Sequence, residues 1–252
     1  MKHTLLYPIG TTESCLFAAS ILKDQGFAFT DHPSPEVTHL LLDVPSFRSD
    51  GKLRSGEDLH TLLSMLPADI MVVGGNLSDP LLSEYATMDL LMDPQYLAMN
   101  AAITADCAIR IAGTHMKSTF FDSPALILGW GRIGKCLASY LKALGCPIAV
   151  AARKNSDLAM IQALGYSPVP FESIPDLVSE YRLLFNTIPA LVLNKDTLAH
   201  CHNCTMIELA STTGLDHPDV IIARGLPGSH APESSGRLIA NTFSRLWKEN
   251  SQ

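Results

Sequence analysis

Three glycines with the spacing G-x-G-x-x-G stand in the middle of the chain, between an apolar run and a helical pattern. The segment Gly129-Trp130-Gly131-Arg132-Ile133-Gly134 directly follows Ala125-Leu126-Ile127-Leu128. The first glycine permits a tight turn, the second lets the main chain approach a diphosphate, and the third lets helix and strand pack closely. Free N–H groups and the helix dipole attract the phosphates. We therefore predict dinucleotide binding by all six residues of this segment; the alternative is an ordinary strand–helix turn.

The residues after the next apolar run indicate which dinucleotide would bind. NAD-binding sites usually place an acid about 20 residues beyond the glycines, on the ribose hydroxyls. Here the run 147–152 is followed by Arg153 and Lys154, and the first acid is Asp157. A guanidinium beside an ammonium attracts a 2′-phosphate and can stack on adenine. The sequence favours NADP over NAD, with a solvated basic helix start as the alternative interpretation.

Polar residues also follow a predicted strand and precede the last predicted helix. Asn186 and Thr187 come at the end of the strand expected at 183–186, where open α/β sheets bind ligands, so we expect cofactor contact there. A capping turn is the alternative. His230 is a candidate catalytic acid or base because histidine exchanges protons near neutral pH, although an unreactive loop histidine is the simpler interpretation.

Candidate substrate contacts lie in the same part of the chain. Ser229 and Ser234, near a helix start, could bind a carboxylate together with helix N–H groups, and Arg224 could pair with an anion. For Arg224, surface charge is the alternative. Glu208 and Asp106 are possible bases, but a buried or capping carboxylate is the commoner outcome for such residues.

The segment 200–204, with the sequence His-Cys-His-Asn-Cys, resembles half of a zinc site. Compact zinc sites need a second ligand pair, and the chain offers none at a suitable spacing. We therefore predict no metal. Six cysteines scattered along a long chain without an export signal are typical of reduced thiols in a cytoplasm.

The composition excludes several classes of function. Lys plus Arg is 18 and Asp plus Glu is 25, which gives a net charge of −7 and a pI near 5.7. This charge disfavours binding to nucleic acid. No apolar run approaches the ~18 residues of a membrane span. We expect a cytoplasmic protein that acts on a small anionic substrate, with neither nucleic acid nor membrane as partner.

Apolar runs of strand length alternate with helical patterns along the chain. Strands are expected at 4–9, 38–44, 69–73, 125–128, 147–152, 183–186, 205–209 and 220–223. Helices are expected at 11–25, 56–66, 96–116, 135–144 and 232–247. This alternation predicts doubly wound parallel sheets covered by helices, an α/β fold. We expect a flavodoxin-like α/β domain in 1–95 and a connecting helix plus Rossmann dinucleotide-binding domain in 96–252. The last helix is free to pack back across that boundary.

Several motifs, taken in order, resemble those of the A subunit of dipicolinate synthase. The resemblance rests on LGWGRIG at 128–134, AAR at 151–153, FNTIP at 185–189 with LN at 193–194, LAS at 209–211 and GLPGSHAP at 225–232. The segment NAAITAD at 100–106 is similar to the one that precedes the family's cofactor domain. The match extends from about residue 95 to 248 and is faint before it.

The resemblance implies a two-domain fold similar to that of formate/glycerate dehydrogenases. It implies an NAD(P)-dependent dehydrogenase subunit that oxidises dihydrodipicolinate to dipicolinate during bacterial sporulation, together with a flavoprotein-like second subunit. It places the nicotinamide end of the cofactor against the loops 186–189 and 225–232, which adds Ile188, Pro189 and Pro227 to the expected cofactor contacts. This architecture often buries a helix pair between subunits, so by analogy we expect a homo-oligomer.

The chain departs from the family pattern at two turns. After the motif LAS the family has Arg-Pro-Gly-Gly, whereas this chain has Thr212-Thr213-Gly214-Leu215; the family's Gly-Gly-Asp-x-Arg turn is replaced by residues 7–12. Two arginines that could grip a dicarboxylate are therefore missing, and such a substrate needs strong donors. Two alternatives stay open: a non-catalytic NADP(H)-binding subunit or sensor that assembles with a partner chain, and a reductase of another small imine or keto acid.

Overall fold

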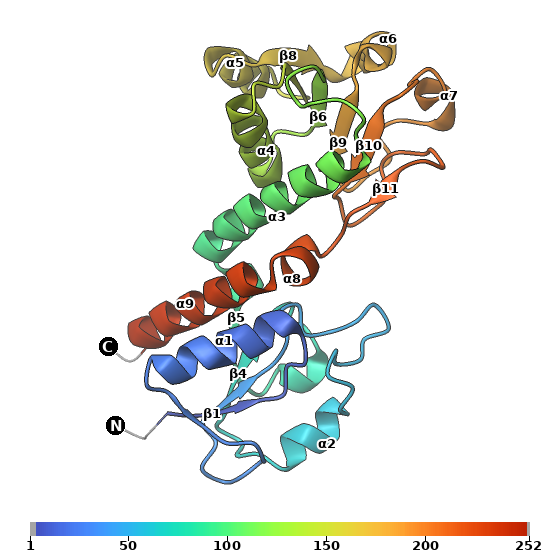
Figure 1. The fold of residues 1–252 in the computed structure, drawn as a ribbon. Helices are drawn as coiled ribbons and strands as arrows, with labels where there is room; N and C mark the ends of the chain where they lie inside the picture. Colours follow the sequence, from blue (N-terminus) through green and yellow to red (C-terminus); the bar gives the residue numbers. More distant parts are fainter. Residues whose placement is uncertain (1–3, 251–252) are drawn as a thin grey trace. The chain divides into compact units, whose positions relative to one another are not determined.

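The structure is a computed structural model that describes residues 4–250, and the chain divides into two compact units (Figure 1). Unit 1 combines the residues up to Asn100 with those from Pro227 onward, and unit 2 is Ala101–Leu226. Each unit contains one parallel sheet with helices packed on it. The predicted α/β class with two doubly wound sheets is therefore confirmed.

Unit 1 is built on a five-stranded parallel sheet with the order β2-β1-β3-β4-β5. This is the flavodoxin-like order, whose switch point lies between β1 and β3. The strands are β1 Leu5–Pro8, β2 Ala28–Phe29, β3 His39–Leu41, β4 Met71–Gly74 and β5 Ala86–Asp89. The helices that lie entirely in this unit are α1 Glu13–Asp24, α2 Leu59–Ser64 and α9 Pro232–Asn250, with the 3-10 helices η1 Pro80–Leu82 and η2 Leu90–Met92.

The sheet of unit 1 separates two apolar cores because alternate side chains of a strand point to opposite faces. Val72 packs in the cluster that contains Leu62 and Leu63 of α2. Its neighbour Val73 packs in the other cluster, which contains residues of α1 and α9 such as Leu22. The three helices thus cover both faces of the sheet.

Helices α1 and α9 lie side by side in unit 1 (Figure 1). Their approach is close because Gly236 of α9 has no side chain: an added Cβ would lie 2.5 Å from both the Ser14 carbonyl oxygen and Phe17 Cβ. The last helix therefore packs with the N-terminal unit, across the boundary expected between residues 95 and 96. The boundary between the units also lies elsewhere than expected. Helix α3 Pro94–His115 begins in unit 1 and continues into unit 2.

Unit 2 contains a six-stranded parallel sheet with the order β11-β10-β9-β6-β7-β8, which is the Rossmann order. Its strands are β6 Ala125–Leu128, β7 Ile148–Ala152, β8 Ser167–Pro170, β9 Leu183–Asn186, β10 Thr205–Glu208 and β11 Ile221–Ile222. Its helices are α4 Arg132–Ala143, α5 Asn155–Ala163, α6 Ile174–Leu177 and α7 Lys195–Leu198, with η3 Phe171–Ser173 and η4 Val178–Glu180; α8 Leu226–His230 starts at the border of the two units. All residues of β6 and β9 are buried, as expected for central parallel strands.

The sequence patterns do not predict the strands β2, β5 and β8 or the helices α5, α6, α7 and α8. Strand β8 contains Pro168 and Pro170 and lies at an edge of its sheet, where the missing N–H groups are tolerated. Strand β2 has only two residues and β5 has only one buried residue. None of these segments carries the apolar pattern from which strands were predicted.

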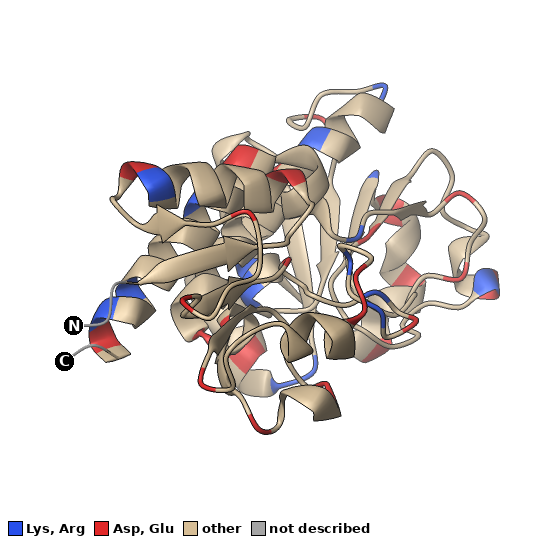
Figure 2. Cartoon of the chain, turned by 90° about the horizontal axis from the view of Figure 1, so that it is seen from below, with Lys and Arg blue, Asp and Glu red and all other residues tan. Residues whose placement is uncertain are grey.

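Charged residues of both signs are interspersed along the helices (Figure 2). On α9, Arg237 pairs with Glu233 at 2.7 Å, and Arg245 pairs with Glu249 at 3.2 Å and with Asp93 at 2.7 Å. Pairs one helical turn apart give modest support to a helix. None of the helices within residues 4–250 has the length and apolar character of a membrane span.

Alanine at position 236 tests the close packing of α1 and α9. In an open helix a change from glycine to alanine stabilises by about 1 kcal/mol. Here the added Cβ must push the two helices apart, so we expect Gly236→Ala to lower the free energy of unfolding by about 1–3 kcal/mol. Urea unfolding measures the change, with Asn241→Ala on the exposed face of α9 as the control. A stabilised Gly236→Ala variant would contradict the described packing.

Candidate functional site

The glycine turn connects β6 to α4 at the carboxyl edge of the unit 2 sheet. Gly129 has a φ of 105°, and a Cβ there would lie 2.5 Å from Thr187 Oγ1. A Cβ on Gly134 would collide with the carbonyl oxygen of Gly129, so glycine lets α4 start this close to β6. A Cβ on Gly131 would meet no described atom within 4 Å, which leaves open space above this residue. The turn thus has the cradle that a diphosphate requires.

Helix α4 begins at Arg132, inside the motif, three residues earlier than predicted. Its N-cap is Gly131, and among the described residues no side chain caps it. The first N–H groups of such a helix, together with its dipole, favour an anion. Arg132 is exposed and Ile133 is half-buried. The main-chain N–H groups at the helix start could therefore receive an anion, and the expected cofactor contacts of Arg132 and Ile133 stay predictions.

Trp130, the remaining residue of the motif, is held by two ring contacts. Its ring meets Tyr166 edge-on at 5.9 Å, and Lys135 Nζ lies 5.7 Å from the ring centre. The indole is half-buried beside the turn. Trp130 therefore forms a wall of the site.

A cavity of about 320 Å³ extends from the glycine turn to the end of β7. Its lining residues lie at or beyond the carboxyl ends of β6, β7, β8 and β9 and are Gly129, Trp130, Gly131, Ala152, Arg153, Lys154, Asp157, Phe171 and Ile188. The guanidinium carbon of Arg153 lies 5.2 Å from the centre of the Phe171 ring. The structure therefore brings the predicted Arg153 and Lys154 together with the turn. Phe171 was missed from the sequence because it follows β8, a strand that was not predicted.

The loop after β9 lies against the glycine turn, where the strand order reverses. The N–H and Oγ1 of Thr187 both donate to the carbonyl oxygen of Leu128, at 3.1 and 2.8 Å. Ile188 lines the cavity, whereas Pro189 is exposed beyond it. Open α/β sheets bind ligands at such a switch point. The loop 187–189 is thus placed as expected for a ligand contact.

Asn186 does not present its side chain to this cavity. The residue is fully buried, and its Nδ2 donates to Glu208 Oε1 at 2.8 Å, to Glu208 Oε2 at 3.1 Å and to the carbonyl oxygen of Ile188 at 3.0 Å. Glu208 is buried as well and accepts further N–H groups from Ala210, Gly214 and Leu215 at 2.7–3.2 Å. Of the two interpretations of Glu208, the structure supports the buried carboxylate over the base. These hydrogen bonds hold the Asn186 side chain inside the loop, and its expected cofactor contact stays a prediction.

Arg224 is anchored at the carboxyl edge of unit 2. Its Nε donates to the carbonyl oxygen of Ala210 at 2.8 Å and its Nη2 donates to Thr213 Oγ1 at 2.9 Å. The guanidinium is therefore placed beside the segment in which the sequence departs from the family pattern. A substrate contact of Arg224 stays a prediction.

Four predicted site residues belong to unit 1, whereas the cavity lies in unit 2. Pro227 is buried, and Ser229, His230 and Ser234 are exposed. Ser229 Oγ lies 2.8 Å from His230 Nδ1. These contacts leave the expected roles of the four residues as predictions.

The turn after β1 in unit 1 stands where the family has an arginine. The buried carboxylate of Asp43 accepts the N–H groups of Thr11 and Thr12, at 3.2 and 3.0 Å, and the Thr12 hydroxyl at 2.6 Å. This hydroxyl therefore does not cap α1. A carboxylate closes this turn from inside the unit, at the carboxyl edge of the sheet.

The cysteine-containing segment 200–204 has no arrangement of metal ligands. Within residues 4–250, no three His, Cys, Asp or Glu side chains gather in a metal-binding cluster. All six cysteines are free thiols. Burial raises the pKa of the Cys204 thiol to about 12 and also raises that of Cys201. Both thiols are thus protonated near neutral pH.

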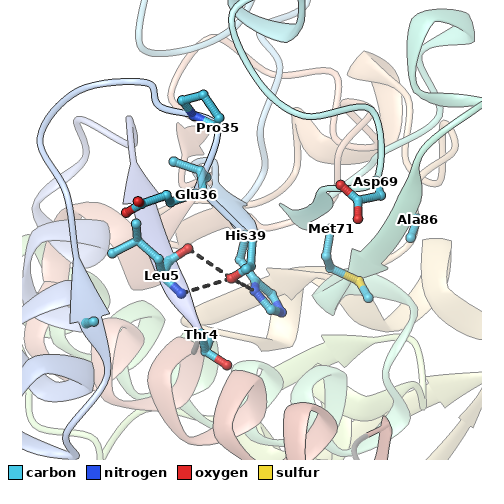
Figure 3. Close-up of a pocket in the computed structure, with 11 residues that line it drawn as sticks. Thr4, Leu5, Pro35, Glu36, His39, Asp69, Met71 and Ala86 are labelled. Atoms are coloured by element: carbon cyan, nitrogen blue, oxygen red, sulfur yellow. Dashed lines mark hydrogen bonds between the residues drawn. The ribbon is translucent and has the colours of Figure 1, made fainter. Parts of the chain in front are cut away.

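A second cavity, of about 660 Å³, lies in unit 1 at the amino-terminal ends of the strands (Figure 3). His39, Glu36 and Asp69 contribute its polar groups. Thr38 Oγ1 accepts the Leu5 N–H and donates to the Leu5 carbonyl oxygen, so its 2.9 Å contact with His39 Nδ1 uses a proton on the imidazole. Open α/β sheets bind ligands at the opposite edge, and the cavity is accordingly distinct from the candidate site.

Comparisons with known proteins identify relatives in sequence and in fold. No family model matches the chain. A curated protein, the A subunit of dipicolinate synthase from Bacillus subtilis (strain 168), is 32% identical over 159 residues, which are 60% of this chain and 54% of that protein. The resemblance inferred from the motifs is thereby confirmed. The match spans about half the length of the curated relative.

Solved structures share the fold over nearly the whole chain. The A subunit of dipicolinate synthase from Bacillus halodurans has a TM-score of 0.85 at 22% identity, covering 97% of this chain and 98% of that one. The A chain of dipicolinate synthase from Bacillus subtilis has a TM-score of 0.83 at 23% identity, covering 99% and 97%. A transhydrogenase from Sinorhizobium meliloti and an L-alanine dehydrogenase reach 0.68 and 0.65 at 11% and 12% identity, over 97% and 98% of this chain and 93% and 90% of theirs. The chain therefore has a two-domain Rossmann-like dehydrogenase fold.

His39 gives the folded chain a pH dependence. Burial lowers the pKa of His39 to about 4, whereas an unfolded chain binds this proton near pH 6.5. The contribution of neutral His39 to the free energy of unfolding is therefore fully present above pH 6.5. It is lost as the pH falls toward 4, by about 2 kcal/mol after allowance for the partial exposure of the side chain. We expect urea unfolding to show this loss in the wild type and a smaller one in His39→Gln. His115→Gln, at the exposed end of α3, is the control; equal pH profiles for wild type and His39→Gln would contradict the assignment.

Proposed function

We propose that this chain is an NADP-dependent oxidoreductase that resembles the A subunit of dipicolinate synthase and oxidises dihydrodipicolinate to dipicolinate. The observation that carries the proposal is the open space above Gly131, bounded by an uncapped helix start and joined to a cavity with two basic residues. A Cβ would fill this space, and a diphosphate needs it. The motif order and the 32% identical relative add the reaction type.

The residues of unit 2 fit a dinucleotide in two parts. The N–H groups at the start of α4 hold the diphosphate, and the cavity beside β7 receives the adenosine half. Arg153, oriented by Phe171, and Lys154 attract a 2′-phosphate. Asp157 lines the same cavity and is the one acid that could hold a ribose hydroxyl of NAD. Two cations against one anion favour NADP, and NAD is the alternative outcome.

The proposed reaction removes a hydride and a proton from a dihydropyridine and leaves an aromatic ring. The bound nicotinamide supplies the hydride acceptor. Aromatisation makes the oxidation favourable, so the chain needs to align the substrate and accept one proton rather than supply a strong base. His230 is the proposed proton acceptor, and Arg224, Ser229 and Ser234 are the proposed partners of the substrate carboxylates. A flavoprotein-like second subunit and a homo-oligomer are part of the same proposal.

A second candidate function rests on the segment 211–215. Here Thr213 accepts a hydrogen bond from Arg224, in the segment where the family has an arginine of its own. A chain without the family's arginines could bind NADP(H) as a non-catalytic subunit or sensor, or could reduce another small imine or keto acid. Turnover separates the candidates: NADPH binding without turnover of dihydrodipicolinate, with or without a flavoprotein, indicates the sensor, and turnover of other small acids indicates the reductase.

Gly131→Ala tests the dinucleotide site directly. The new methyl group meets no described atom of the chain, so we expect the thermal midpoint to stay within about 2 °C. It occupies the space that the diphosphate needs, so calorimetric affinity for NADPH should fall by more than about tenfold. Gly113→Ala, an exposed glycine on α3, is the control. Wild-type protein that gives no binding heat with any oxidised or reduced pyridine nucleotide would overturn the proposed function.

Arg153→Asp tests the choice of cofactor. Replacing the cation by an anion repels a 2′-phosphate and offers an acceptor to a ribose hydroxyl, so NADP affinity should fall by more than about tenfold while NAD affinity holds or rises. Arg182→Asp makes the same charge change at a position outside the cavity and should leave both affinities unchanged. Equal losses for NADP and NAD in Arg153→Asp would show that Arg153 does not select the cofactor.

A further inference from the structure

Glu208 is a carboxylate without solvent exposure at the end of β10. Its Oε1 accepts Asn186 Nδ2 at 2.8 Å and the Ala210 N–H at 3.0 Å. Its Oε2 accepts Asn186 Nδ2 at 3.1 Å and the N–H groups of Gly214 and Leu215 at 2.7 and 3.2 Å. All of these contacts bring an N–H group to the carboxylate, which suits the anion and offsets its desolvation.

The five contacts join two loops that are far apart in the sequence. One loop, 186–190, follows β9, and the other, 210–215, follows β10; both leave the sheet at its carboxyl edge. Asn186 relays the connection, because its Oδ1 accepts the Ile188 N–H at 3.1 Å while its Nδ2 also donates to the Ile188 carbonyl oxygen at 3.0 Å. The side chain of Asn186 therefore fixes the main chain on both sides of Ile188.

Gly214 shows how tightly the two loops fit. A Cβ at this position would meet Asn186 Nδ2, the Ala190 carbonyl oxygen at 2.5 Å and the Ile188 carbonyl oxygen at 3.2 Å. The N–H groups of Val192 and Leu193 donate to the Gly214 carbonyl oxygen, at 2.8 and 3.0 Å. Hydrogen bonds and close packing thus connect the two loops around Glu208.

The two connected loops lie in the half of the unit 2 sheet where, in a Rossmann fold, the second mononucleotide of a dinucleotide binds. Strands β6, β7 and β8 carry the glycine turn and the Arg153 cavity, whereas β9, β10 and β11 lie on the other side of the switch point. In a Rossmann sheet each set of three strands binds one mononucleotide. The loops that Glu208 connects are the ones that follow β9 and β10.

We infer that Glu208, acting through Asn186, is the positioning residue that holds the loops 186–190 and 210–215 in the form that binds the nicotinamide half of the cofactor. This inference rests on the proposed function. Glu208 is not a catalytic residue, because its oxygens are buried and occupied by N–H donors. Its contribution is to fix the shape of the site before the ligand arrives, which lowers the entropic cost of binding.

The test compares two ligands on the same variants. NADPH covers both halves of the site, and adenosine 2′,5′-bisphosphate covers only the half beside Arg153. In Glu208→Gln one of the two acceptor oxygens becomes an NH2 group that faces only N–H donors, so the contacts of that oxygen are lost and the connection between the two loops is weakened. We expect calorimetric NADPH affinity to fall about tenfold or more, and adenosine bisphosphate affinity to change by less than about threefold.

A double variant tests the contact between the two side chains. In Asn186→Asp/Glu208→Gln the new amide at position 208 can donate to the new carboxylate at position 186, although the main-chain partners of both side chains gain no substitute. The loss of NADPH affinity in the double variant should therefore be smaller than the product of the losses in Asn186→Asp and Glu208→Gln alone. Should Glu208→Gln not fold, Asn186→Ala replaces it, because Glu208 there keeps its main-chain donors, and the same contrast between the two ligands is expected.

Three results would overturn the inference. Unchanged NADPH affinity in Glu208→Gln or Asn186→Ala would show that the connection does not position the loops. Equal losses of affinity for NADPH and for adenosine bisphosphate would show that Glu208 only stabilises unit 2 as a whole. Losses that simply multiply in the double variant would show that the contact between positions 186 and 208 does not position the loops. A wild-type chain that binds neither ligand overturns the proposed function itself, and this inference with it.

Discussion

The contact between Gly134 and the carbonyl oxygen of Gly129 determines how closely α4 follows β6. Any side chain at position 134 would fill the space that the turn occupies, and the helix would then start farther from the sheet. Because α4 starts here with an uncapped N-terminus, its first N–H groups remain available at the carboxyl edge. The exposure of these N–H groups therefore follows from a steric constraint on one residue.

Both units use a buried carboxylate to organise the carboxyl edge of the sheet. In unit 1, Asp43 accepts two N–H groups and a hydroxyl from the turn after β1. In unit 2, Glu208 accepts N–H groups from two loops. A buried acid is costly unless donors surround it, so each one restricts its loops to conformations that supply those donors. The loops that follow the strands are thus held by the sheet, which suits sites that must exist before a ligand binds.

The two departures from the family pattern fall at these same edges. The turn after β1 is closed by Asp43, and the segment 211–215 is held by Glu208 and Arg224. Both turns are well satisfied by hydrogen bonds within their own units, although their residue types differ from the family's. The similarity to the A subunit of dipicolinate synthase thus extends to the fold, whereas the two turns differ in the donors that would hold a doubly charged substrate, which is where the proposed functions differ.

The sequence by itself determined the alternation of strands and helices, the glycine turn and the basic pair after β7, because each depends on neighbours within a few residues. It also allowed the last helix to return to the first unit. Only the tertiary structure decided that Asn186 points at Glu208, that Phe171 orients Arg153 and that α9 packs on α1 through Gly236. These contacts join residues separated by about 18 to over 200 positions in the sequence. A local sequence pattern does not indicate which distant residues the order of the strands brings together.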